Sequence, residues 1–102
     1  MKVYISGPMT GLPGNNFPAF MAAEYDLTTR GFEVLNPARN QLPPDSTWAD
    51  YMRKDIAMLL QADSVCLLPG WIKSRGARLE AQIAQALGMP ISEYALMGEE
   101  RA

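Results

Sequence analysis

Short apolar segments alternate with amphipathic helical segments along this chain, and the alternation constrains the fold more than any other feature. The expected strands are residues 2–6, 32–35, 64–68 and 90–92. Residues 64–68 form an apolar run of the kind that is buried on both faces of a parallel sheet. The pattern predicts an α/β fold: a three-layer, Rossmann-like or flavodoxin-like parallel sheet of four to five strands with helices on both faces.

Three helices are expected between these strands. The first begins near Asn16, which offers a helix cap, and ends at Gly31. The second begins at a capping-box sequence, residues 47–50, and the third spans residues 76–87. Spacing places one face of the second helix in the core, with Asp55 just outside it; that face comprises Trp48, Tyr51, Met52, Ile56, Leu59 and Leu60.

Length and charge limit the classes of partner. The 102 residues fit one domain, 1–102, and so small a domain leaves little depth for an enclosed pocket. A site shared within a homodimer or larger homo-oligomer is therefore expected, and the tail from Tyr94 to Met97 could reach a neighbour. A net charge of -2 and a pI near 5.0 argue against nucleic-acid polymers as partners. With no amino-terminal signal and no apolar stretch of membrane length, we expect a cytoplasmic protein without membrane contact.

The composition also restricts the chemistry. The chain has no histidine, which removes Ser-His-Asp and Cys-His mechanisms and most zinc sites, so neither a metal nor a cofactor is expected. The single cysteine, Cys66, falls inside an expected strand and is interpreted as a buried residue. Carboxylates must therefore carry any acid–base chemistry.

The loop after the first strand, residues 6–11, is a candidate ligand loop because ligands bind beyond the carboxyl ends of parallel strands. It matches neither G-x-G-x-x-G nor a Walker A loop, which disfavours ATP hydrolysis. Its glycines would let backbone N–H groups approach a ligand, although a tight turn alone would also need glycine. The candidate binding residues here are Gly7, Pro8, Met9, Gly11 and Asn16.

The second candidate loop, residues 69–76, precedes the third helix. Ser74 and Gly76 stand at the helix start, where free N–H groups attract an anion, and Glu80 lies one turn further on. Glu80 could equally be a surface glutamate. Arg75 could bind a phosphate or only solubilise the loop, and Trp71 could stack on a base or fill an apolar gap.

These motifs, taken in order, resemble the nucleoside 2-deoxyribosyltransferase superfamily, and most closely its short DUF4406 branch, which occurs in phages and bacteria. The resemblance covers roughly residues 2–91. It rests on residues 4–11, 36–37, 51–55, 62–63, 67–71 and Ser74-x-Gly76-x-x-x-Glu80.

The resemblance implies cleavage of the N-glycosidic bond of a 2′-deoxynucleoside or its 5′-monophosphate, as a glycosidase (hydrolase) or transferase without a cofactor. By position, Glu80 would be the nucleophile, Asp55 would assist the departing base, and Tyr4 would orient the nucleophile. Ser74 and Gly76 match the phosphate-binding loop of the nucleotide-hydrolysing members. The transferases carry an aspartate near Ser74, so this difference favours a nucleotide N-hydrolase.

Two other hypotheses stay open on the sequence. The chain could bind a nucleotide to sense or sequester it without turnover, since that aspartate is missing. It could also be a structural or host-interaction protein on an enzyme-like scaffold. Nucleotide binding without product would favour the first hypothesis, and an empty pocket with a bound protein partner would favour the second.

Overall fold

Residues 1–94 are described by the computed structural model, which confirms the expected alternation of strands and helices with element ends shifted by no more than two residues. None of the helices in this part of the chain is long and apolar enough to cross a membrane. The elements are β1 (Lys2–Ser6), α1 (Phe17–Thr29), β2 (Glu33–Leu35), α2 (Trp48–Leu59), β3 (Ser64–Leu67), α3 (Arg75–Ala86) and β4 (Ile91–Glu93).

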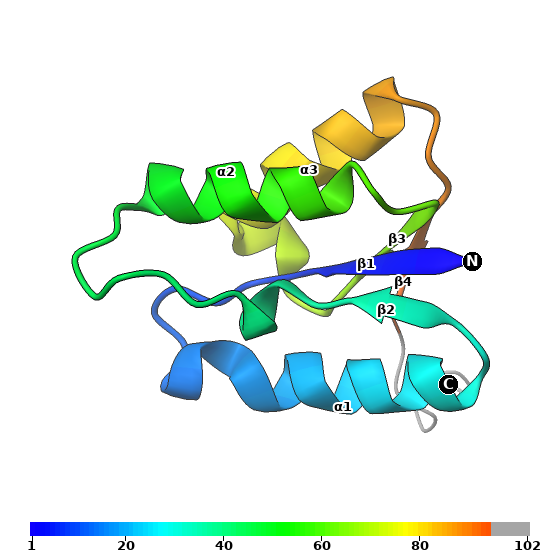
Figure 1. The fold of residues 1–102 in the computed structure, drawn as a ribbon, viewed down its shortest axis with the longest axis horizontal. Coiled ribbons are helices and arrows are strands. Elements are labelled where there is room, and N and C mark those ends of the chain that lie inside the picture. The colour runs from blue at the N-terminus through cyan, green and yellow to red at the C-terminus, as the bar shows by residue number, and fades with distance from the viewer. Residues whose placement is uncertain (95–102) are drawn as a thin grey trace.

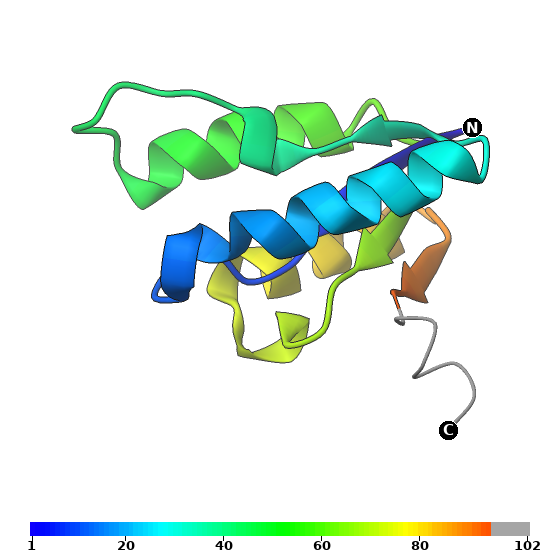
Figure 2. The ribbon, with the colours of Figure 1, turned by 90° about the horizontal axis from the view of Figure 1, so that it is seen from below.

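The four strands of the described residues form one parallel sheet in the order β2-β1-β3-β4. Helix α1 covers one face, and α2 and α3 cover the other (Figure 1). Figure 2 views the molecule from below, with α1 in front of the sheet. The predicted three-layer α/β architecture is therefore confirmed, with four strands.

The side chains of β1 alternate between the two faces, as the period of a strand requires. Val3 and Ile5 pack with Phe20 of α1 in one buried cluster. Tyr4 packs with Leu59 and other residues of the α2 and α3 side in a second cluster. Ser6 is two residues from Tyr4, so its side chain also lies on the side of the sheet that α3 covers.

The buried face of α2 differs from the face predicted to lie in the core. The capping box of α2 forms as expected, with Thr47 and Asp50 each bonding to the other's backbone N–H. The buried side chains are Met52, Asp55 and Leu59, whereas Trp48, Tyr51 and Leu60 are exposed. Trp48 and Tyr51 belong to the first turns of α2. These turns extend past the carboxyl end of β1, where no strand lies beneath the helix (Figure 1).

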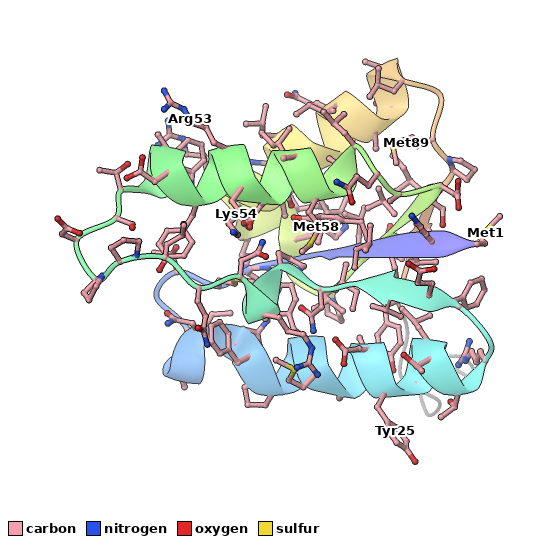
Figure 3. The ribbon with its side chains drawn as sticks, viewed as in Figure 1. Met1, Tyr25, Arg53, Lys54, Met58 and Met89 are labelled. Carbon is pink, nitrogen blue, oxygen red and sulfur yellow. The ribbon has the colours of Figure 1, made fainter. Side chains whose placement is uncertain are left out.

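The outer faces of the helices carry exposed side chains such as Tyr25 on α1 and Arg53 on α2 (Figure 3). Tyr94, the last described residue, donates a hydrogen bond from its hydroxyl to Asp26 Oδ2 at 3.0 Å. Residues 95–97, the rest of the tail expected to reach a neighbour, lie outside the described residues. The homo-oligomer stays a prediction.

Candidate active site

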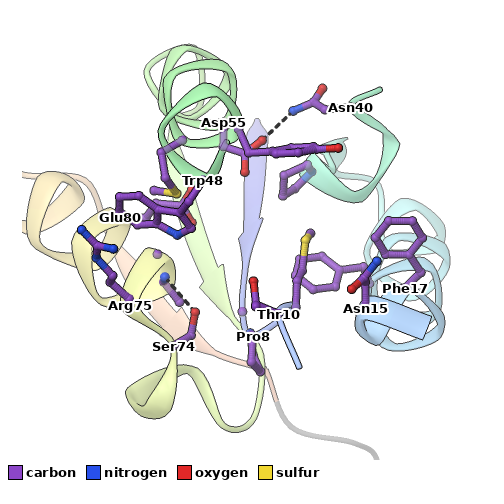
Figure 4. Close-up of a pocket in the computed structure, with 18 of the residues that line it drawn as sticks. Pro8, Thr10, Asn15, Phe17, Asn40, Trp48, Asp55, Ser74, Arg75 and Glu80 are labelled. Carbon is purple, nitrogen blue, oxygen red and sulfur yellow. Dashed lines mark hydrogen bonds between the residues drawn. The ribbon is translucent and has the colours of Figure 1, made fainter. Parts of the chain in front are cut away.

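A cleft of about 690 Å³ opens at the carboxyl ends of β1 and β3, within the volume range of small-molecule sites. The strand order reverses between these two strands, because the chain leaves β1 toward α1 on one face and β3 toward α3 on the other. Loops separate at such a switch point and leave a crevice. The cleft is lined by residues of both predicted loops, of α1 and of α2 (Figure 4).

Glu80 lies at the base of this cleft and is almost fully buried, with 4% of its surface exposed. The side chain of Ser74 caps α3 by accepting a hydrogen bond from the Ala77 N–H at 3.1 Å. The buried face of α3 consists of Ala77, Glu80 and Ala84, so small residues on either side of Glu80 let the helix approach the sheet. Glu80 therefore belongs to the inner face of α3 and is not a surface glutamate.

Two hydroxyl groups of β1 hold the Glu80 carboxylate. Tyr4 donates from its hydroxyl to Glu80 Oε2 at 2.7 Å, and Ser6 donates to Oε1 at 2.6 Å. Tyr4 and Ser6 are themselves completely buried. Each oxygen of Glu80 thus has its own donor, and both donors come from one face of one strand.

The surroundings of Glu80 raise its pKa from 4.5 to about 7. Burial is the main cause, because it disfavours the charged form, and the nearby Asp55 adds to the rise. The hydrogen bonds from Ser6 and Tyr4 act in the opposite direction. Burial, together with Glu80 and Asp55, raises the pKa of Tyr4 far above its ordinary value, so Tyr4 stays a neutral donor at physiological pH.

Asp55 of α2 is the second carboxylate of the cleft. Asn40 donates from Nδ2 to Asp55 Oδ1 at 2.8 Å, and both residues line the cleft (Figure 4). Burial raises the pKa of Asp55, while Asn40 and Lys54 oppose that rise. In residues 1–94 no group of three or more histidine, cysteine, aspartate or glutamate side chains is arranged to hold a metal ion.

The start of α3 forms a positively charged corner of the cleft. Lys73, Ser74, Arg75 and Gly76 all line it. The Arg75 guanidinium lies over the Trp48 ring, 3.8 Å from its centroid, which is cation–π geometry. A Cβ on Gly76 would lie 3.1 Å from Met52 Sδ, so glycine allows α3 to pack closely against α2. Free N–H groups of the first helical turn add to this anion-binding character.

Most of the predicted site residues meet at this cleft. Tyr4 contacts Glu80 from behind, and the predicted residues that line the cleft are Gly7, Pro8, Met9, Asp55, Ser74, Arg75, Gly76 and Glu80. Gly7 lets the first loop approach the end of β3 closely, because a Cβ there would lie 2.8 Å from the Cβ of Leu68.

Three predicted binding residues lie outside the cleft lining. Asn16 has a left-handed backbone and makes no side-chain cap; its Nδ2 instead donates to the Pro8 carbonyl at 2.9 Å, which closes the first loop. Trp71 is partly buried, packs against the apolar cluster that contains Leu67, and lines a separate, smaller cavity. Gly11 serves a turn with a φ of +84°.

Several residues of the site were not predicted. Ser6 could have been found from its spacing to Tyr4, since residues two apart on a strand share a face. Asn40 contacts Asp55 across 15 positions of sequence, and no local pattern indicates such a contact. Thr10 and Lys73 also line the cleft and fall inside the two predicted loops, although neither was among the candidate binding residues. The other additional lining residues are Asn15, Phe17, Phe20, Pro37, Trp48, Tyr51, Met52 and Ala77.

The fold and the cleft define a flavodoxin-like α/β protein with a buried carboxylate at its switch point. The chain belongs to the family described as a domain of unknown function, DUF4406, whose sequence profile matches residues 1–93. No curated protein matches the chain by sequence.

The fold is shared with solved structures. One is the 2-deoxyribosyltransferase from the psychrotolerant bacterium Bacillus psychrosaccharolyticus, which superposes with a TM-score of 0.73. The match covers 91% of this chain and 71% of that enzyme at 21% sequence identity. At this identity, the similarity establishes the common fold.

Proposed function

We propose that this protein cleaves or transfers the N-glycosidic bond of (deoxy)nucleosides or their 5′-monophosphates, with Glu80 as the nucleophile. The observation that carries the proposal is the Glu80 carboxylate, held by Tyr4 and Ser6 at the base of a nucleotide-sized cleft that Asp55 also lines. The shared fold with an enzyme described as a 2-deoxyribosyltransferase supports the same chemistry.

The proposed reaction has two steps, as in other retaining glycosyl transfers. In the first, a Glu80 oxygen forms a bond to C1′ while the C1′–N bond breaks and its electron pair stays on the base. Protonated Asp55 supplies the proton that the departing base takes up. In the second, water or another base attacks C1′ and gives up a proton to the Asp55 carboxylate, the C1′–O bond breaks, and its electron pair returns to Glu80.

Exposed aromatic residues support the recognition of a base. Trp48, Tyr51 and Phe17 line the cleft, and between 37% and 39% of the surface of each is exposed. Aromatic rings in such a position can stack on a planar base. Lys73 and Arg75 line the same cleft near the start of α3, and their charge suits a 5′-phosphate.

Incubation with the common deoxynucleosides, ribonucleosides and their 5′-monophosphates, followed by chromatography, tests the proposal. The expected result is a free base from at least one of these compounds. The alternative result is a nucleotide that raises the thermal stability of the protein and yet yields no free base after a long incubation. That pair of results would support a binding protein and would contradict the proposed catalysis.

Asp55→Asn is expected to lower the rate of base release by roughly 10²–10⁴-fold, because asparagine cannot deliver a proton to the departing base. The loss should be much smaller for a deoxyriboside whose leaving group needs no proton. Asp45→Asn, which changes an exposed loop carboxylate, serves as the control. An equal loss with both kinds of leaving group would show that Asp55 does not act as the acid.

Arg75→Gln is expected to raise the KM for a nucleoside 5′-monophosphate by about 10-fold, because a charge-assisted bond to phosphate is lost. The KM for the matching nucleoside should stay the same. Arg78→Gln is a close control, because Arg78 stands three residues further along α3 and lines a separate, smaller cavity. Similar KM changes for nucleotide and nucleoside would contradict a phosphate role for Arg75.

A further inference from the structure

Ser6 is a buried residue whose hydroxyl contacts the proposed nucleophile, Glu80. Its side chain is fully buried, and its hydroxyl donates to Glu80 Oε1 at 2.6 Å, which is the shorter of the two hydrogen bonds to this carboxylate. The Ser6 carbonyl accepts a hydrogen bond from the Leu68 backbone N–H at 2.8 Å. This bond ties the last residue of β1 to the residue that follows β3. A strand residue held in this way presents its hydroxyl to Glu80 with little freedom.

The hydroxyl of Ser6 stays uncharged throughout the physiological pH range. The titratable groups that act on Glu80 are Tyr4 from β1 and Asp55 from α2, while Lys73 and Arg75 line the same cleft. Burial and Asp55 disfavour the ionised form of Glu80, and only the two hydroxyl donors on β1 oppose them among the causes of its shifted pKa. Ser6 is therefore one of two groups that favour the carboxylate.

We propose that Ser6 is a positioning residue for Glu80 that acts chiefly in the step that releases the sugar from the enzyme. This inference rests on the proposed function. In the glycosyl-enzyme, Glu80 is a neutral ester joined to C1′. When water attacks C1′ and the C1′–O bond breaks, the electron pair and the negative charge return to the Glu80 carboxylate, and the attacking water gives up a proton to Asp55, which lost its own proton in the first step.

A hydrogen bond to a charged oxygen is stronger than one to a neutral ester oxygen. The Ser6 donor therefore strengthens as the ester breaks and weakens as it forms. Removing the donor should slow the release of the sugar more than its capture. The covalent intermediate should then accumulate, although the variant still cleaves the N-glycosidic bond of the substrate in the first step.

The first test is a pH titration of Glu80 by carboxyl-carbon NMR in the protein without substrate. Ser6→Ala is expected to raise the pKa of Glu80 from about 7 to about 8, because the charged form loses a hydrogen bond. Ser6→Thr and Ser6→Val form a matched pair that differs by the hydroxyl group, so only the valine variant should show the same rise. Ser64→Ala, at the start of β3, is the control. An unchanged Glu80 pKa in both the alanine and valine variants would overturn the proposal.

The second test follows a single turnover by rapid acid quench and mass spectrometry. Ser6→Ala and Ser6→Val should slow the decay of the glycosyl-enzyme by about 10-fold and increase the peak level that it reaches, and Ser6→Thr should restore both. If the wild type releases base but the intermediate decays equally fast in all variants, the role of Ser6 is wrong and the proposed function stands. If the wild type releases no base from any substrate, the proposed function and the release role both fail.

Discussion

Replacing Glu80 with glutamine is expected to lower the rate of base release by on the order of 10⁴-fold or more, because the amide cannot serve as the nucleophile. Glutamine has nearly the same size as glutamate and can still take part in hydrogen bonds with Tyr4 and Ser6, the two residues that hold the carboxylate. The fold and the cleft should therefore persist. Chromatographic measurement of released base gives the rate, and circular dichroism checks the fold.

The control for this variant is Glu33→Gln, which changes an exposed glutamate at the start of β2. Its rate should equal that of the wild type. Binding of the nucleotide to Glu80→Gln, measured by calorimetry, should also remain within a few-fold of the wild type. A Glu80→Gln protein that is folded and releases base at the wild-type rate would show that another group attacks C1′.

The same replacement is expected to change how the stability of the protein depends on pH. In the folded protein the pKa of Glu80 is about 7, against an ordinary value of 4.5. Between these two pH values the folded state retains a proton that the unfolded state has lost, so the free energy of unfolding falls as pH rises. The full effect corresponds to about 3 kcal/mol, present below pH 4.5 and lost above pH 7.

In Glu80→Gln this decrease in the free energy of unfolding with rising pH should be absent, because glutamine does not titrate. Urea unfolding at pH 5 and at pH 8 measures most of this effect: the wild type should lose about 2–3 kcal/mol more stability between the two pH values than the variant does. Asp55, whose pKa is also raised, is present in both proteins, as are Glu24 and Asp50, whose pKa values are lowered. Parallel stability profiles would show that Glu80 ionises normally in the folded protein.

The arrangement of strands and helices could be predicted from the sequence because its causes are local. The apolar run of residues 64–68, the capping box at Thr47 and the serine cap at Ser74 each act within a few positions. The buried face of α2 could not be predicted in this way. Trp48 and Tyr51 fit a helical stripe but are exposed, because the first turns of α2 extend past the end of β1.

The site shows the same division between local and long-range causes. The two loops at the strand ends could be located from the order of the elements, and eight of the predicted residues line the cleft. The burial of Glu80 depends on tertiary packing, because α3 approaches β1 through Ala77 and Ala84. Likewise, Arg75 and Arg78 are close in sequence but line different cavities, a separation that only the packed helix defines.

The most direct test of the central claim is to identify the residue that carries the sugar. A nucleotide that yields free base is incubated with the protein, the reaction is quenched with acid during turnover, and the peptides are analysed by mass spectrometry. The account predicts a pentosyl or phosphopentosyl adduct on the peptide that contains Glu80, attached at that side chain and absent from Glu80→Gln. Base release with an adduct on a different residue, or at the same rate from Glu80→Gln, would contradict it.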